Sequence, residues 1–335
     1  MREASTAIAA IATIAVAVLV APGAAAQTVV PDYVPVAADA TPAVTSATEL
    51  SGGVLLLQVA SPAMRREVPV KVLPAADRSR PHGVYYLLDG NSGQVDDNNW
   101  LDPARGDAAA FFADKDVNVV FPIGGTGSMY TDWVQDHPKF GRAQWESFLS
   151  KELPPLIDAR FGTNGRNAIG GISMGATAAM MLAERAPEVY DGAVGYSGCY
   201  LTEGPAGKAL TDLVVINGNG TSDQMWGPPG SETWRSHDVF LGAPRLAGKP
   251  VYLSSGSGLP GPHENPNAPG FAQSVVVGGV MEFAVSLCTD QLAQTLREAG
   301  AHVTRGASPV GLHAWPYWRD ELGRSWPTIR AATGG

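Results

Sequence analysis

Short apolar runs separated by amphipathic stretches follow one another along most of the chain. Residues 53–61 and 67–75 alternate between apolar and polar side chains and are joined by turn residues, which predicts an antiparallel hairpin. Six later runs are more continuously apolar or rich in glycine, as is typical of strands buried on both faces. These runs are residues 83–90, 117–125, 167–173, 191–198, 249–258 and 302–308.

Helix candidates lie between these runs, at residues 103–113, 142–159, 174–186, 276–299 and 316–331. Alternation of strands and helices predicts an α/β protein with a mostly parallel central sheet of about eight strands and helices on both faces. No internal repeat and no linker marks a second domain, so we expect one domain over residues 49–335. Two insertions rich in glycine and proline, residues 217–231 and 254–270, are long enough to be functional loops.

The first residues have the pattern of an export signal. After Arg2, an apolar run ends in an Ala24-x-Ala26 cleavage pattern, which predicts a secretory signal peptide over residues 1–26. An uncleaved membrane anchor is the alternative, because the run approaches the roughly 20 residues that span a bilayer. We expect residues 27–48 to be poorly ordered, no later segment to span a membrane, and the protein to be secreted or held in the cell envelope.

Composition narrows the class of protein. The 335 residues are 45% hydrophobic, which fits a large globular domain. A net charge of −9 without a basic cluster argues against nucleic acid as a partner. Cys199 and Cys288 form an even number in an exported chain, which favours one disulfide over two free thiols. No metal-ligand spacing and no dinucleotide-binding motif appears, so we expect no cofactor.

Candidate chemistry begins at the segment Gly171-Ile172-Ser173-Met174-Gly175, which lies between a predicted strand and a predicted helix. This is the setting of a G-x-S-x-G nucleophile elbow. The sharp turn strains the serine backbone and leaves no room for side chains two residues before and after it, which explains the glycines. The elbow predicts Ser173 as a nucleophile at a helix N-terminus, where the backbone N–H of Met174 would stabilise an oxyanion.

Such a serine needs a histidine base and a carboxylate, in the chain order serine, acid, histidine. Three histidines follow far enough along the chain. His313 follows the last predicted strand, His263 precedes it, and His302 lies inside it, so His313 is the preferred base. No carboxylate comes directly after the strand near residue 255, and spacing alone leaves Glu264 and Glu282 as rivals for the acid.

The region from Tyr85 to Trp318 resembles the mycolyltransferase family, which comprises the antigen 85 proteins and their actinobacterial relatives. The stretches that carry the resemblance are YYLLDG, a following glutamine and DDNNW, FPIGGTGSMYTDW, WESFLSKELPPLI, GGISMGA, DQMWGPPGSETW, MEFAVSLCTDQL and GLHAWPYW. The resemblance implies an α/β-hydrolase fold for the domain. It also implies Ser173 as nucleophile, Glu282 as acid, His313 as base and the backbone N–H of Asn91 as second oxyanion donor.

Family members that transfer mycolic acid to trehalose bind the sugar through an Asp, an Arg, a Gln and a Trp. Asp89, Gln94 and Trp315 match three of these and are candidate substrate-binding residues, although Trp315 also fits plain core packing. Asn91 and Ser92 stand where the family has leucine and arginine. Serine lacks the charged, forked donor of arginine, so the identity of the sugar stays open.

The preferred interpretation is a secreted serine acyltransferase that forms an acyl-enzyme. It would take a mycolic or other long-chain acyl group from an acyl glycolipid and pass it to a trehalose-type or cell-wall carbohydrate hydroxyl. A secreted carboxylesterase that uses water is one alternative. A noncatalytic envelope binding protein is another, because the family includes members that have lost the triad, but all three triad residues are present here.

Overall fold

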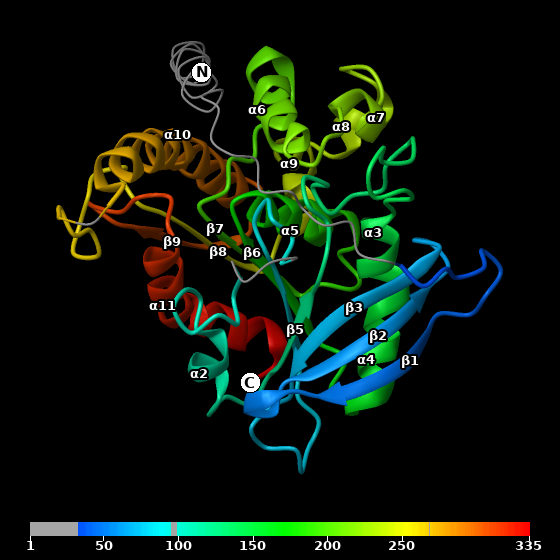
Figure 1. Ribbon diagram of the computed structural model, residues 1–335. Coiled ribbons are helices and arrows are strands. Elements are labelled where there is room, and N and C mark those ends of the chain that lie inside the picture. Colours follow the sequence, from blue (N-terminus) through cyan, green and yellow to red (C-terminus); the bar gives the residue numbers. More distant parts are fainter. Residues whose placement is uncertain (1–32, 95–98, 268) are drawn as a thin grey trace.

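The computed structural model describes residues 33–94, 99–267 and 269–335 (Figure 1). The expected signal peptide, residues 1–26, lies outside the described residues, and so does the segment 27–32. The remaining chain forms one central sheet with helices packed on both of its faces.

The sheet has nine strands in the order β1-β2-β3-β5-β4-β6-β7-β8-β9. Pairs β1–β2, β2–β3 and β3–β5 are antiparallel, and every pair from β5 to β9 is parallel. The strands are β1 (Ala43–Glu49), β2 (Leu55–Ser61), β3 (Arg66–Leu73), β4 (Val84–Leu88), β5 (Asn118–Pro122), β6 (Asn167–Ile172), β7 (Gly192–Tyr196), β8 (Pro250–Ser255) and β9 (His302–Ala307). The predicted α/β class, the mostly parallel sheet and the starting hairpin are confirmed.

Strand β1 was not predicted, and it raises the number of strands from about eight to nine. It pairs with β2 from Ala43↔Ala60 to Glu49↔Leu55, so the expectation of poor order over 27–48 is wrong for residues 43–48. Most of its side chains are exposed. Such a strand is held mainly by its backbone hydrogen bonds and leaves little apolar alternation in the sequence.

Ten helices lie among the described residues, and three short helical turns accompany them. The helices are α2 (Ala108–Phe112), α3 (Trp145–Ser147), α4 (Leu153–Phe161), α5 (Met174–Arg185), α6 (Gly204–Ile216), α7 (Ser222–Trp226), α8 (Glu232–Ser236), α9 (Val239–Gly242), α10 (Phe271–Glu298) and α11 (Trp315–Thr333), and the turns are η1 (Ser51–Gly53), η2 (Phe148–Glu152) and η3 (Ala243–Leu246).

The helix predictions hold best for the long helices α5, α10 and α11. The candidate at 103–113 shrinks to α2, because the residues before it form turns, with Arg105 N–H donating to the Asp102 carbonyl at 3.0 Å. Helix α6 was not predicted, although a proline in its first turn is a helix-start signal. The insertion 217–231 is also not a plain loop, because it contains α7.

The core consists of two apolar layers, one on each face of the sheet. Strand β4 shows the alternation: Tyr86 and Leu88 pack in the layer that holds α5, whereas Tyr85 and Leu87 pack in the layer that holds α2 and α11. Figure 1 shows α2 and α11 together on one side, with α5, α9 and α10 across the sheet. Since both faces are covered, a site is expected at the carboxyl ends of the parallel strands.

Helix α10 is, among the described residues, the one helix long and apolar enough to cross a membrane by length and composition. The expectation that no later segment could span a bilayer therefore does not hold on composition alone. The helix belongs to the domain, however, because Leu292 and Leu296 are buried in the core and Cys288 is bonded to Cys199.

Candidate active site

Ser173 lies on the sharp turn between β6 and α5. Its φ of 53° and ψ of −119° put a non-glycine residue in a rarely populated region of backbone conformation. A Cβ at Gly171 would lie 2.6 Å from backbone atoms of Gly175, and a Cβ at Gly175 would lie 2.2 Å from the Asp89 carbonyl oxygen. Both glycines are therefore required by close backbone approach, as the motif predicts.

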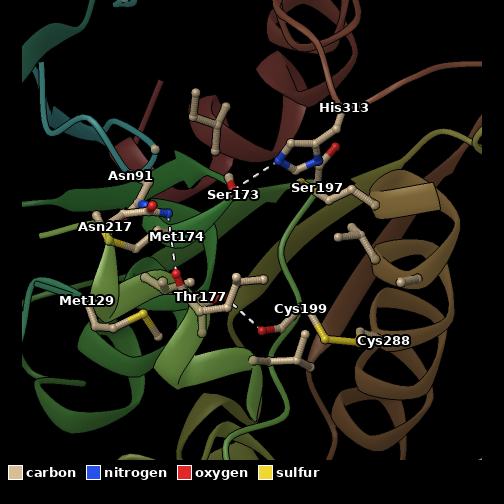
Figure 2. A pocket seen from close by; sticks show the side chains of 18 of the residues that line it. Asn91, Met129, Ser173, Met174, Thr177, Ser197, Cys199, Asn217, Cys288 and His313 are labelled. Carbon is tan, nitrogen blue, oxygen red and sulfur yellow. Dashed lines mark hydrogen bonds between the residues drawn. A yellow bond between two sulfur atoms is a disulfide. The ribbon is translucent and has the colours of Figure 1, made fainter. Parts of the chain in front are cut away.

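Two hydrogen bonds join Ser173, His313 and Glu282 in a chain. His313 Nε2 lies 3.0 Å from Ser173 Oγ, and His313 Nδ1 lies 2.8 Å from Glu282 Oε2. Figure 2 shows the histidine ring pointing at the serine hydroxyl. The three residues come from distant segments: the β6–α5 elbow, the middle of α10, and the loop between β9 and α11.

Glu282 is buried, and its carboxylate is held by two donors besides the histidine. Ser197 Oγ donates to Oε1 at 2.7 Å, and the Gly256 N–H donates to the same oxygen at 2.7 Å. Trp318 Nε1 in turn donates to Ser197 Oγ at 3.0 Å. Sequence reasoning missed Ser197; the available signal was its position directly after the carboxyl end of β7, next to the nucleophile strand.

The rival residues lie elsewhere. Glu264 Oε2 accepts hydrogen bonds from Gly261 N–H, at 2.5 Å, and from the Tyr317 hydroxyl. His263 Nε2 lies 2.7 Å from Asp320 Oδ2. His302 is an exposed residue at the start of β9. None of these three side chains is joined to Ser173 by a hydrogen bond within the described part of the chain.

A cavity of about 340 Å³ opens at Ser173 and His313 (Figure 2). Apolar side chains of α6 and α10 form part of its walls, with Leu210, Leu213, Val214, Met281, Ala284 and Val285 among the lining residues. Met174 and Asn91 line the same cavity beside Ser173. The structure therefore brings both expected oxyanion residues next to the nucleophile.

The expected sugar-binding residues divide into two groups. Asp89 and Trp315 line the cavity, together with Ser92, whose hydroxyl lies 3.4 Å from Asp89 Oδ2. Trp315 also packs edge-on against Trp100, at 5.2 Å between ring centroids. Gln94 is buried and donates from Nε2 to the Pro122 carbonyl at 3.3 Å, and it is not among the described lining residues.

The predicted disulfide between Cys199 and Cys288 is confirmed, with a Cα–Cα distance of 5.0 Å. Cys199 follows β7, and Cys288 lies on α10 beyond Glu282, so the bond ties that helix to the sheet edge near the site. Both cysteines also line the cavity. The bond closes a sequence separation of 89 residues.

One group of side chains in the described residues could hold a metal by its geometry: Asp77, His82 and Asp116. The group precedes β4 and β5, at the opposite end of these strands from Ser173. Arg80 already binds both carboxylates, at 3.2 Å to Asp77 and 3.0 Å to Asp116. The group of Asp77, His82 and Asp116 is not part of the Ser173 site.

The fold and the strained serine elbow define the protein as an α/β-hydrolase. A family model described as "Putative esterase" matches residues 61–329. The diacylglycerol acyltransferase/mycolyltransferase Ag85B of Mycobacterium avium is 30% identical over 289 residues, which are 83% of this chain and 83% of that protein. Ag85A of Mycobacterium tuberculosis is also 30% identical, over 290 residues. The chain belongs to the antigen 85 mycolyltransferase family of esterase-like proteins.

Solved structures agree with this assignment. The crystal structure of Mycobacterium tuberculosis MPT51 (FbpC1) aligns with a TM-score of 0.68 and 28% identity, over 86% of this chain and 99% of that chain. An S-formylglutathione hydrolase from Agrobacterium tumefaciens aligns with a TM-score of 0.54 and 17% identity over 86% of this chain. At that identity the second match supports the fold alone.

Proposed function

We propose that the protein is a serine acyltransferase that forms an acyl-enzyme on Ser173 and passes the acyl chain to a carbohydrate hydroxyl. The observation that carries the proposal is the hydrogen-bond chain from Ser173 Oγ through His313 to Glu282. Family membership supports acyl transfer, because the relatives at 30% identity are named as diacylglycerol acyltransferases and mycolyltransferases.

In the first half of the reaction Ser173 attacks the ester carbon of the acyl donor. His313 Nε2 takes the hydroxyl proton as the new C–O bond forms, and Glu282 stabilises the resulting imidazolium. The tetrahedral oxyanion would be bound by the backbone N–H groups of Met174 and Asn91. Losing one such donor costs about 2.7–4 kcal/mol in well-studied hydrolases. Collapse expels the donor alcohol, which receives the proton from His313.

The second half runs the same steps with a new nucleophile. An acceptor hydroxyl gives its proton to His313 and attacks the acyl carbon, and Ser173 leaves with that proton restored. The acyl chain itself would lie in the apolar cavity between α6 and α10, whose size lies within the usual range of about 300–1,000 Å³ for ligand sites. Apolar walls of this kind favour a long hydrocarbon chain over a polar acyl group.

Export is part of the proposal. Residues 1–26 would act as a signal peptide, and the enzyme would act in the cell envelope or outside the cell. The catalytic domain would begin before the expected residue 49, because β1 (Ala43–Glu49) is part of its sheet. The Cys199–Cys288 disulfide supports this placement, because such bonds persist in oxidising compartments.

A carboxylesterase is the second candidate, favoured by the match to the esterase family model. It would share every step up to the acyl-enzyme and differ only in using water as acceptor. A noncatalytic binding protein is disfavoured. A site without catalytic function would not require a serine with a strained backbone whose Oγ lies 3.0 Å from a histidine nitrogen.

The decisive experiment is labelling with a serine-directed phosphonate, read by intact mass. Wild-type protein should gain one label, and Ser173→Ala should gain none and lose nearly all acyl transfer. Labelling that survives in Ser173→Ala would refute the nucleophile. Products formed from an acyl-trehalose, with and without added carbohydrate, then separate transfer from hydrolysis.

A further inference from the structure

Two loops meet at the end of the sheet opposite the active site and bring a histidine and two aspartates close together. The first loop, residues 74–83, joins β3 to β4, and the second, residues 113–117, leads into β5. The first supplies Asp77 and His82, and the second supplies Asp116. Ligand atoms of the three side chains all lie within 4.8 Å of one another.

We propose that Asp77, His82 and Asp116 form a binding site for a divalent transition-metal ion, with zinc as the ion that fits them best. Imidazole nitrogen and carboxylate oxygen are ligands that zinc takes in proteins, and three protein ligands leave a fourth position for water. Calcium and magnesium prefer oxygen ligands throughout. The ion would tie the two loops together and would take no part in the chemistry at the active site.

His82 is the residue that points to a ligand. Its side chain is only 6% exposed, yet Nε2 has no hydrogen-bond partner among the described residues. Asp77 Oδ2 lies 3.9 Å away, beyond hydrogen-bond reach. A buried polar atom without a partner destabilises the fold, and most buried polar atoms have one. A metal ion between the imidazole and the carboxylates would supply the missing partner.

Each carboxylate has one oxygen fixed by hydrogen bonds. Asp77 Oδ1 accepts from the backbone N–H and the hydroxyl of Ser79, at 2.8 and 2.6 Å. Asp116 Oδ1 accepts from the Asp77 N–H at 3.2 Å. The other oxygen of each, Oδ2, is bonded to Arg80, at 3.2 Å for Asp77 and 3.0 Å for Asp116. Both Oδ2 atoms therefore face a position that favours a positive charge.

Arg80 neutralises the two carboxylates but leaves the histidine without a partner. Its side chain is 62% exposed, and exposed ion pairs contribute little to stability. A metal ion could therefore displace the guanidinium into solvent at a small cost. Arginine has only hydrogen-bond donors and serves the carboxylates alone here, whereas a metal ion would bind the carboxylates and the His82 nitrogen together.

The backbone beneath these side chains is fixed without a metal. Ala76 N–H donates to the Lys115 carbonyl at 3.1 Å. Asn118 N–H donates to the Gly83 carbonyl at 3.0 Å, and Asn118 Oδ1 accepts from the Ala75 N–H at 3.1 Å. Binding would therefore require movement of side chains and not of the loops. No metal-ligand spacing appears in the sequence, because the third ligand comes from a separate loop.

The first test measures zinc binding to metal-stripped protein by calorimetry. Wild type should bind one zinc ion at this site, at least tenfold more tightly than calcium or magnesium. Asp116→Asn should weaken zinc binding at least tenfold, since loss even of an outer hydrogen-bond partner weakens metal binding about 10- to 100-fold. Asp114→Asn, whose carboxylate is 82% exposed on the same loop, should leave it unchanged.

Two results of this titration would overturn the proposal. One is the absence of zinc binding that depends on Asp116. The other is equal affinity for zinc and calcium, which would mean adventitious binding to surface carboxylates without the histidine.

Histidine variants locate the bound zinc. His82→Gln should weaken zinc binding at least tenfold, whereas His263→Gln, which removes a histidine paired with Asp320 elsewhere on the surface, should leave it unchanged. Zinc binding that His263→Gln removes and His82→Gln retains would refute the assignment. Because His82 is buried, its variant can lose stability, and Asp116→Asn then decides the site alone.

Arg80→Ala distinguishes a metal site from a plain ion pair. Removing the competing cation should tighten zinc binding at least threefold. Saturating zinc should then raise the melting temperature of this variant by more than it raises that of wild type, because stabilisation grows as the dissociation constant falls. A purely structural ion pair predicts a loss of stability that zinc does not restore. That result, or an unchanged zinc affinity in Arg80→Ala, would overturn the inference.

Discussion

Glu282 and Glu184 are the two most deeply buried glutamates among the described residues, and their surroundings differ completely. Glu282 on α10 is 1% exposed and its carboxylate is bonded to Ser197, Gly256 and His313. Glu184 on α5 is 0% exposed, and neither of its carboxyl oxygens has a hydrogen-bond partner among the described residues. Burial alone therefore does not mark a functional carboxylate; the donors around it do.

The donors determine what each glutamate can do. Glu282 accepts hydrogen bonds from two fixed donors and is bonded to the ring of His313. At Glu184, burial raises the pKa well above its ordinary value, and the nearby charge of Asp238 raises it further. The first glutamate can orient the ring of His313, whereas the second is kept neutral.

Exchanging the two acids for amides gives the largest expected contrast. Glu282→Gln should lower kcat for ester cleavage by up to about 10⁴-fold, as loss of the orienting acid does in serine proteases. Glu184→Gln should leave ester cleavage within about twofold, because it touches no reacting group. Steady-state kinetics on a p-nitrophenyl ester checks both.

Glu264→Gln provides the comparison with the acid that spacing alone left open. Its loss should be far smaller than that of Glu282→Gln, since Glu264 bonds to Tyr317 and Gly261 and not to His313. Equal, mild losses in both variants would mean that the acid has been assigned to the wrong residue.

Much of the Ser173 site could be predicted from the sequence, but not all of it. The elbow around Ser173 is local, because backbone strain and glycine spacing lie within five residues, and His313 follows from strand order. The acid could not be derived in this way. Glu282 lies in the middle of a long helix, where a glutamate is usually a solvated surface group, and only the family resemblance singled it out.

The parts that sequence could not provide depend on contacts between distant segments. Ser197 donates a hydrogen bond to Glu282, which lies 85 positions further along the chain, and no periodic pattern predicts such a contact. Strand β1 is exposed and depends on pairing with β2, so it left no apolar signature. The burial of Glu184 could not be predicted from the sequence either, because it requires α9 to pack directly on the carboxyl group.

The disulfide also distinguishes the surroundings of Glu282 from those of Glu184. It holds α10, which carries Glu282, whereas α5 has no such bond among the described residues. Replacing both cysteines by serine should reduce the free energy of unfolding by roughly 4 kcal/mol in the chain-entropy model. Denaturant unfolding measures the loss, and hydrogen exchange should show it first in α10. Equal acceleration of exchange in α5 would contradict a local role for the bond.

Ser197 tests whether donors around Glu282 matter for activity. Removing a hydrogen bond to a charged group costs about 1.5–3 kcal/mol, so Ser197→Ala should lower kcat roughly 10- to 100-fold.

The backbone at Ser197 requires a matched control, because its φ is 53°. Glycine adopts such a conformation without strain, whereas alanine does not. Ser197→Gly should therefore show the same loss of kcat as Ser197→Ala. Full activity in the glycine variant would assign the effect to strain and not to the hydroxyl.

The smallest expected effect is on stability at Glu184, and its sign depends on pH. The pKa of Glu184 is raised in the folded state above its ordinary value of 4.5, so the fold holds a proton that the unfolded chain releases. Stability from this residue is therefore complete below about pH 4.5 and is lost as the pH rises toward the folded pKa. Glutamine does not titrate, so Glu184→Gln should melt higher than wild type by an amount that grows from pH 4 to pH 8.

The neighbours of Glu184 decide how large this difference becomes. Asp238 and Glu146 raise the pKa of its carboxyl, whereas Arg245 and Arg185 lower it, so the arginines limit the effect. We expect a gain of about 1–2 kcal/mol at pH 8, in the range of a buried polar group without a partner. Thermal unfolding at the two pH values measures it. A gain that is equal at both, or larger in acid, would show that the pKa of Glu184 is not raised in the folded protein.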